Sequence, residues 1–229
     1  MRPAGCGTPR TEQNTVCFTG HRRIEPESVP EIRRRLQEAI LRCYGQGFRW
    51  FMCGGALGFD TLAAEEVLAF RADHPDTGLF LAIPCAEQAA HWSLSDRRRY
   101  DRIRNSADDE LVLSPFYFKG CMHVRNRFMV QHSAFCICYL KQFEGGTGYT
   151  VRYALSASRE IVNLYENPSS PALMKEQLSN CTFTSPSVSG NAPTVHLRHS
   201  PAAAGRKWKN ISMRFSGRRA SGSTKQMNR

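Results

Sequence analysis

Two glycine turns supply the clearest candidates for chemistry in this sequence. One follows the apolar run 50–53 and the other follows the apolar run 133–140, and a helical pattern begins just beyond each turn. Glycine lets the chain turn sharply and lets a ligand approach bare peptide groups. The first N–H groups of a helix, with the positive end of its dipole, suit a phosphate or a carboxylate. Plain strand-to-helix turns are the alternative interpretation. The predicted phosphate cradle consists of Gly54, Gly55, Gly145, Gly146 and Thr147.

Charged and polar residues near these turns are candidates for catalysis and for ligand contacts. Asp60 and Glu65 belong to the first turns of the helix that follows Gly55. Each carboxylate could accept a hydrogen bond from a ribose hydroxyl or act as a general acid or base, whereas Asp60 could instead stabilise the helix dipole. The other predicted ligand-binding residues follow the first strand or begin a later helix: Thr19, Gly20, His21, Arg22, Arg125 and Asn126.

Regularly alternating elements are expected to position these residues. Short apolar runs, interpreted as strands, alternate with segments whose apolar residues recur at helical spacing. Strands that are apolar on both faces predict a mostly parallel sheet of about six strands between two helical layers, an α/β/α sandwich. Ligands of such sheets bind beyond the carboxyl ends of the strands, near the switch in strand order. We expect strands at 15–19, 48–53, 79–83, 110–113, 133–140 and 160–164, and helices at 31–44, 59–72, 89–105, 122–132 and 149–158.

The excess positive charge lies outside the predicted domain. Residues 1–166 contain 21 Lys and Arg against 19 Asp and Glu, whereas residues 167–229 contain 10 against 1. The basic segment is rich in Ser, Pro and Gly and has no periodicity, which is typical of a disordered tail. We therefore predict a disordered N-terminus (1–13), a folded domain (14–166) and a basic disordered tail. Because the domain is nearly neutral, nucleic acid would be contacted only through the tail.

The cysteines and the apolar segments indicate the class of protein. Nine cysteines are scattered singly, mostly inside apolar runs, and no C-x-x-C pair or metal-binding histidine spacing occurs. We therefore expect reduced core cysteines, no metal and no cofactor. No segment has the length and apolarity of a membrane span, and the N-terminus lacks the pattern of a secretory signal. A cytoplasmic protein without a membrane partner is expected.

Five segments, taken in order, resemble those of a known family. Together they resemble the YpsA-like branch of the SLOG superfamily, which also includes the LOG-type phosphoribohydrolases and the DNA-processing protein DprA. The resemblance covers about residues 14–166, and it implies a Rossmann-like α/β/α fold that binds nucleotides or nucleotide-derived ligands. The segments are FTGHR (18–22), GALGFDTLAAE (55–65), AIPC (82–85), RNRFMV (125–130) and GGTGYTV (145–151).

The second glycine turn departs from the LOG-type pattern. LOG-type enzymes cleave the N-glycosidic bond of nucleoside monophosphates and carry a turn of the form G-G-x-G-T-x-x-E. When that pattern is laid on the turn at Gly145, the glutamate position falls on Arg152. A carboxylate would stabilise an oxocarbenium-like sugar in the transition state, and an arginine cannot. LOG-type hydrolysis by the residue at this position is therefore not expected.

These observations leave several functions open. The first hypothesis is binding of a nucleotide or nucleotide-derived ligand, such as ADP-ribose or a nucleoside phosphate, in a cleft between the two glycine turns. The protein would then be either an enzyme acting on an N-glycosidic bond, with Asp60 or Glu65 as its carboxylate, or a ligand sensor in a stress or defence response. A DprA-like single-stranded DNA-binding protein is the alternative. A homo-oligomer is compatible with each of these.

Overall fold

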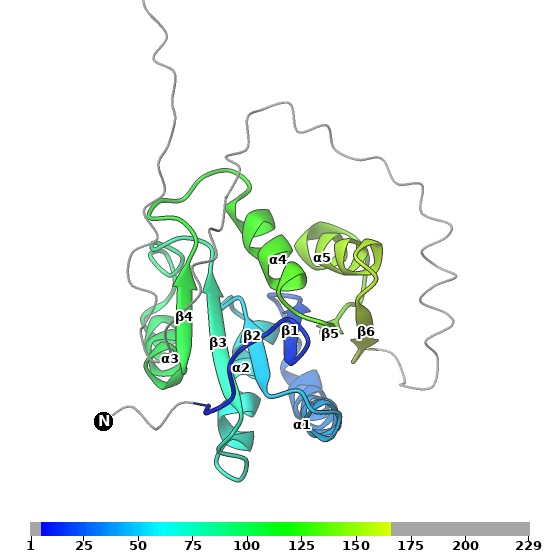
Figure 1. Cartoon of the computed structure of the whole chain (residues 1–229). Coiled ribbons are helices and arrows are strands. Elements are labelled where there is room, and N and C mark those ends of the chain that lie inside the picture. Colours follow the sequence, from blue (N-terminus) through cyan, green and yellow to red (C-terminus); the bar gives the residue numbers. More distant parts are fainter. Residues whose placement is uncertain (1–5, 166–229) are drawn as a thin grey trace, which may run out of the picture. The chain divides into compact units, whose positions relative to one another are not determined.

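The computed structural model describes residues 6–165, which form six strands and five α-helices (Figure 1). All strand pairs among these residues are parallel, which confirms the predicted α/β fold. The strands are β1 (Thr15–Gly20), β2 (Trp50–Cys53), β3 (Gly78–Ile83), β4 (Asp109–Val112), β5 (Phe135–Tyr139) and β6 (Glu160–Asn163). The helices are α1 (Val29–Gly45), α2 (Phe59–Phe70), α3 (Leu94–Ser106), α4 (Cys121–Gln131) and α5 (Gly145–Ser156), with a short 3-10 helix, η1 (Pro26–Ser28), before α1.

The order of the strands creates a switch point between β1 and β5. The sheet reads β4-β3-β2-β1-β5-β6. The chain therefore moves outward from β1 to β4, crosses back over the sheet through α4, and continues on the other side of β1. At the carboxyl edge Thr19 pairs with Cys138 and Gly20 pairs with Tyr139. The loops that leave β1 and β5 diverge at this edge, so a ligand site is expected between them.

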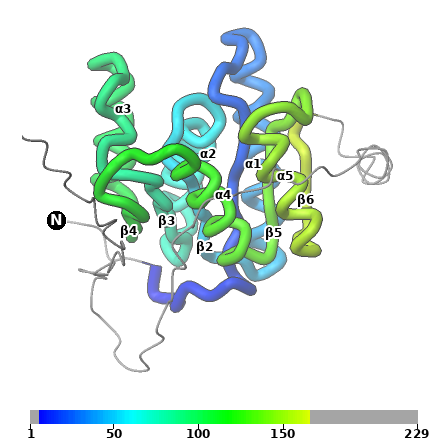
Figure 2. Tube along the Cα trace, turned by 90° about the horizontal axis from the view of Figure 1, so that it is seen from above, coloured from blue at the N-terminus to red at the C-terminus, as the bar shows by residue number. Residues whose placement is uncertain are grey.

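Successive residues of β1 face opposite helical layers. Val16 and Phe18 belong to a core cluster with residues of α1, α2 and α3, whereas Cys17 belongs to a second cluster with residues of α4 and α5. Helices α4 and α5 lie side by side over that second face (Figures 1 and 2). Because side chains alternate along a strand, Thr19 points to the same side as Cys17. The α4–α5 layer and the end of β1 therefore enclose a common space.

The starts of two helices differ from the predicted residues by four or five positions. Helix α3 begins at Leu94 instead of residue 89, because the Ser93 side chain accepts a hydrogen bond from the Asp96 N–H and caps the helix there. Helix α5 begins at Gly145 instead of residue 149, so the second glycine turn is itself the first turn of the helix. This second difference matters for the site, since it places the unpaired N–H groups of α5 on the glycine turn.

Residues 6–13 are part of the fold, contrary to the expectation that residues 1–13 are disordered. The Trp50 indole N–H donates to the Thr8 carbonyl over 2.8 Å, and the Arg10 guanidinium lies 4.0 Å above the Phe80 ring. This segment therefore covers apolar residues of β2 and β3 on the face that α4 and α5 leave open. The predicted basic tail lies outside the described residues. No helix within residues 6–165 has the length and apolarity needed to cross a membrane.

Candidate functional site

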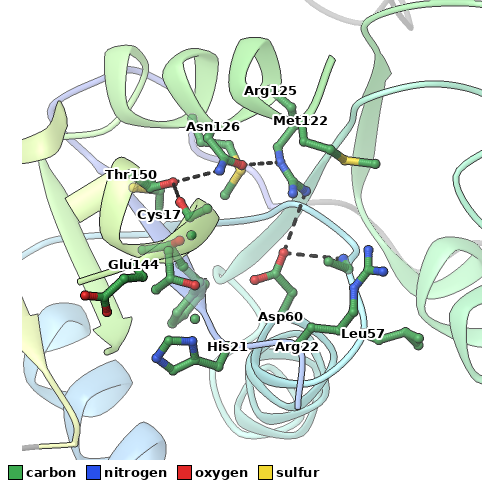
Figure 3. A pocket seen from close by; sticks show the side chains of 18 of the residues that line it. Cys17, His21, Arg22, Leu57, Asp60, Met122, Arg125, Asn126, Glu144 and Thr150 are labelled. Carbon is green, nitrogen blue, oxygen red and sulfur yellow. Dashed lines mark hydrogen bonds and ion pairs between the residues drawn. The ribbon is translucent and has the colours of Figure 1, made fainter. Parts of the chain in front are cut away.

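A cavity of about 450 Å³ lies at the carboxyl ends of β1 and β5, at the switch point of the sheet (Figure 3). Its walls come from the end of β1, the start of α2, the inner side of α4, and the loop that leads from β5 into α5. Most of the residues predicted from the sequence converge here. Those that line the cavity are Thr19, Gly20, His21, Arg22, Asp60, Arg125, Asn126, Gly145, Gly146 and Thr147.

The end of β1 contributes a buried hydroxyl group and an imidazole. Thr19 is 7% exposed, and its side chain lines the cavity. The His21 Nε2 accepts a hydrogen bond from the Lys141 N–H over 2.9 Å, so a neutral ring carries its proton on Nδ1. Burial lowers the pKa of His21, and the charge of Lys141 lowers it further. His21 is therefore a neutral side chain that can donate from Nδ1. Its hydrogen bond with Lys141 also connects the end of β1 to the loop after β5.

The start of α5 offers backbone donors and a second hydroxyl side chain. Glu144 is the N-cap residue, and its side chain forms no capping hydrogen bond. The first N–H groups of the helix have no intrahelical acceptor. Thr147 is 8% exposed and lines the cavity. Unpaired donors at the positive end of a helix dipole are suited to an anion.

Asp60 and Arg125 form a buried pair beside these groups. The Arg125 Nη1 lies 3.7 Å from the Asp60 Oδ2, and each residue is 6% exposed. Burial raises the pKa of the Asp60 carboxyl group, while Arg125 and the N–H groups of Ala56 and Gly54 oppose that rise. Burial lowers the pKa of Arg125, and Asp60 opposes that change. The pair thus brings a carboxylate and a guanidinium to the cavity wall.

A chain of hydrogen bonds along the cavity wall joins the two glycine turns, and Figure 3 shows its links between Arg125, Asn126 and Thr150. The Arg125 Nη1 donates to the Gly54 carbonyl, and its Nε donates to the Asn126 Oδ1 over 2.6 Å. The Asn126 Nδ2 donates to the Thr150 hydroxyl over 2.7 Å. That hydroxyl in turn donates to the Gly146 carbonyl over 2.8 Å. The position of the α5 N-terminus is therefore coupled to the turn after β2.

The first glycine turn supports the site from outside the cavity. Neither Gly54 nor Gly55 is among the lining residues. A Cβ added to Gly54 would lie 1.6 Å from the Arg125 Nη1, so glycine is needed there to admit the guanidinium. The Gly55 carbonyl accepts a hydrogen bond from the Gln88 Nε2 over 2.6 Å, and its φ of +63° favours glycine. The cleft expected between the two glycine turns is thus a cavity between β1, α4 and α5.

Glu65 also lies away from the cavity, in contrast to its prediction as a catalytic residue. Its carboxylate accepts hydrogen bonds from the Arg33 Nη2 over 2.7 Å and from the Arg99 Nε and Nη2 over 2.5 and 2.6 Å. These contacts join α2 to α1 and α3. The physical reason is the helix period: five residues correspond to about 500°, so Glu65 points roughly 140° away from Asp60.

Cys17 and Thr150 are among the cavity residues that were not predicted from the sequence. Cys17 lines the cavity, although its apolar surroundings indicated a core cysteine. The available signal was its position two residues before Thr19, which places both on one face of β1. Thr150 also lines the cavity, one helical turn after Gly146. Within residues 6–165, no group of three or more His, Cys, Asp or Glu side chains is arranged to hold a metal ion.

Comparison with known proteins agrees with this architecture. The model of the YpsA family, described as the YspA SLOG family, matches residues 16–166, more than half of the chain. The chain belongs to this SLOG family. A UPF0398 protein of Halalkalibacterium halodurans is 28% identical over 129 residues, which cover 55% of this chain and 68% of that protein. A UPF0398 protein of Bacillus licheniformis is 24% identical over 132 residues, covering 56% and 72%.

A solved structure of another protein shares the fold of this family member. It is the DNA processing protein A of Helicobacter pylori, described for its single-stranded DNA binding mode. The TM-score is 0.50 at 20% sequence identity, and the match covers 74% of this chain and 73% of that chain. This likeness supports the Rossmann-like α/β architecture.

Proposed function

We propose that this YpsA-family protein binds a nucleotide or a nucleotide-derived molecule, such as ADP-ribose or a nucleoside phosphate, in the cavity between β1 and β5. The observation that carries the proposal is the convergence of the α5 N-terminus with two hydroxyl side chains, Thr19 and Thr147, which both line the cavity. Phosphate oxygens would accept hydrogen bonds from both hydroxyls and from the α5 N–H groups.

The size and chemistry of the cavity suit the rest of such a ligand. Its volume of about 450 Å³ lies in the range of small-molecule sites. Arg22 and Arg125 bring positive charge to its wall, and Asp60 brings one carboxylate. A carboxylate accepts hydrogen bonds from ribose hydroxyls, and in an enzyme it would stabilise positive charge on the sugar as an N-glycosidic bond breaks. Arg152 cannot stabilise positive charge on the sugar, because it is not a carboxylate. Its Nη1 donates to the Phe143 carbonyl.

A binding screen with a matched pair of variants tests the proposal. The full chain is screened by thermal shift against AMP, ADP-ribose, NAD, other nucleotides and cyclic dinucleotides. A ligand at 100 times its Kd adds about 2.7 kcal/mol to stability. For the compound that binds, we expect Thr147→Val to weaken binding by about 1.5–3 kcal/mol, because a hydrogen bond to a charged group is lost. Absence of any shift would remove the proposal.

Thr77→Val is the matched control for this experiment. Thr77 is a buried threonine as well, but it precedes β3 at the opposite edge of the sheet. Ligand affinity should therefore be unchanged in this variant. If both variants weaken binding equally, the effect comes from general destabilisation and not from a contact at the start of α5.

Product analysis separates an enzyme from a sensor. Mass spectrometry of the ligand after incubation would show a free base and a sugar phosphate if the N-glycosidic bond is cleaved. In that case we expect Asp60→Asn to abolish cleavage and Glu65→Gln to retain it, because only Asp60 lines the cavity. An intact ligand with a clear thermal shift would instead favour a sensor.

Single-stranded DNA binding is a second candidate, favoured by one surface feature. The loop between β4 and α4 exposes three consecutive aromatic residues, with Phe116 66%, Tyr117 63% and Phe118 41% exposed. Exposed aromatic rings can stack on unpaired bases in a sequence-tolerant manner. Fluorescence anisotropy with a labelled oligothymidylate, with and without residues 167–229, would show whether any binding belongs to this loop or to the basic tail.

A further inference from the structure

The floor of the cavity carries a pair of thiols from neighbouring strands. Cys17 of β1 lines the cavity, and Cys136 of β5 is its register partner. Both belong to the core cluster on the α4–α5 side, so their side chains point to the same face of the sheet. Both are free thiols in the structure. Cys17 is therefore the member of the pair that a molecule in the cavity would meet.

The spacing of the pair is compatible with a covalent bond. Adjacent strands lie about 4.8 Å apart, and the Cα atoms of disulfide-bonded cysteines are usually about 4.4–6.8 Å apart. The two thiols are close enough to shift each other's pKa: Cys136 lowers the pKa of Cys17, and Cys17 raises the pKa of Cys136. Of the two, only Cys17 lines the cavity, so Cys17 is the thiol that an incoming reagent meets first.

We propose that Cys17 and Cys136 form a peroxide-sensitive site, in which hydrogen peroxide entering the cavity oxidises Cys17 and Cys136 resolves the product to a disulfide. Hydrogen peroxide is the named oxidant because it is close to water in size. Cys17 is only 1% exposed, so larger oxidants would be excluded. This reaction requires the cavity and the two thiols only, and it does not depend on the nucleotide.

The chemistry balances in two steps. The Cys17 thiolate attacks one peroxide oxygen, an S–O bond forms, and the O–O bond breaks. The departing hydroxide takes a proton and leaves as water, so that Cys17 becomes a sulfenic acid. The Cys136 sulfur then attacks the Cys17 sulfur, the S–S bond forms and the S–O bond breaks. The second hydroxide takes the Cys136 proton and leaves as water. Two thiols are oxidised and one peroxide is reduced.

Peptide mapping of the full chain after peroxide treatment tests this site. Under native conditions we expect a Cys17–Cys136 linked peptide that disappears on reduction. Cys85 and Cys121 provide a matched control pair, because their thiols are also in contact but neither lines the cavity, and burial raises the pKa of Cys85. Cys43 is a control for a single buried thiol, since burial raises its pKa to about 12. The Cys17–Cys136 link should form about tenfold or more faster than oxidation at the controls.

Two variants assign the roles within the pair. In Cys136→Ser, mass spectrometry after peroxide treatment should show added oxygen on Cys17, because the resolving thiol is absent. In Cys17→Ser, oxidation of Cys136 should fall to the rate of Cys43. The proposal is overturned if the wild-type pair stays reduced while Cys43 is oxidised, or if Cys136 is oxidised equally fast without Cys17. The wild-type measurement alone decides the matter if either variant fails to fold.

Discussion

Replacing Arg125 by methionine tests the buried charge pair on which the cavity wall depends. The Arg125 Nη1 lies 3.7 Å from the Asp60 Oδ2. At an effective dielectric constant of about 20, two unit charges at this distance attract by about 4.5 kcal/mol. Methionine fills similar space but leaves Asp60 without its counter-charge. Removing one member of a buried pair costs about 3–5 kcal/mol, so we expect Arg125→Met to lose that much stability at pH 8.

The loss should depend on pH in a defined direction. Burial already raises the pKa of Asp60 in the folded state, and removal of Arg125 raises it further. A group with a raised folded-state pKa favours folding at low pH, and this contribution is lost as pH rises through the folded-state value. Urea denaturation at pH 5 and pH 8 should therefore show a smaller defect for Arg125→Met at pH 5.

Comparing the double variant Asp60→Asn/Arg125→Met with Arg125→Met alone can refute this reasoning. It contains neither charge, and neutral replacements of a buried pair are often tolerated, so it should be more stable than Arg125→Met alone at pH 8. The reasoning fails if the double variant is no more stable, or if the single variant shows the same defect at both pH values. Arg127→Met, at a half-buried position on the same helix, should change stability by only about 0.5 kcal/mol.

Three further substitutions, two near this pair and one at Glu65, are tested by measuring stability in denaturant. Gly54→Ala should cost about 1–3 kcal/mol, since its Cβ would lie 1.6 Å from the Arg125 Nη1; unchanged stability would contradict that contact. Thr150→Val removes the 2.8 Å hydrogen bond to the Gly146 carbonyl and should cost about 1–3 kcal/mol. For Glu65, burial is outweighed by hydrogen bonds from two arginines, which lower its pKa. The contribution of Glu65 to the free energy of unfolding is therefore lost as pH falls. Glu65→Gln should be about 1 kcal/mol less stable than the wild type at pH 7. The difference between the two proteins should disappear below about pH 4.

The strands and helices, and their order along the chain, could be predicted because each depends on the pattern of apolar residues within its own segment. The run Thr15–Gly20 is apolar on both faces since both faces are covered. In α1 the buried residues recur at helical spacing, which the sequence displays directly: Ile32, Leu36, Ala39, Ile40 and Cys43. The rule that ligands bind beyond the carboxyl ends of the strands then identified the polar residues after β1 and the turn before α5.

The roles of the first glycine turn and of Glu65 could not be predicted, because they depend on distant partners. Gly54 meets Arg125, which lies 71 residues further along the chain. Nothing in the local sequence distinguishes a glycine that admits a guanidinium from one that admits a phosphate. Glu65 is occupied by Arg33 and Arg99 of two other helices. Pairings of this kind are set by the packing of helices, and a single sequence does not contain that information.

The hydrogen-bond chain along the cavity wall gives the first glycine turn an indirect influence on ligand binding. Gly54 holds Arg125, and the chain continues through Asn126 and Thr150 to the carbonyl of Gly146. Each link is buried or half-buried, so water cannot easily replace a broken bond, and a shift at one end must be absorbed along the chain. The N–H groups of α5 would then be displaced from the positions they need around an anion. A substitution at Gly54 should therefore weaken anion binding at the start of α5, although Gly54 itself does not line the cavity.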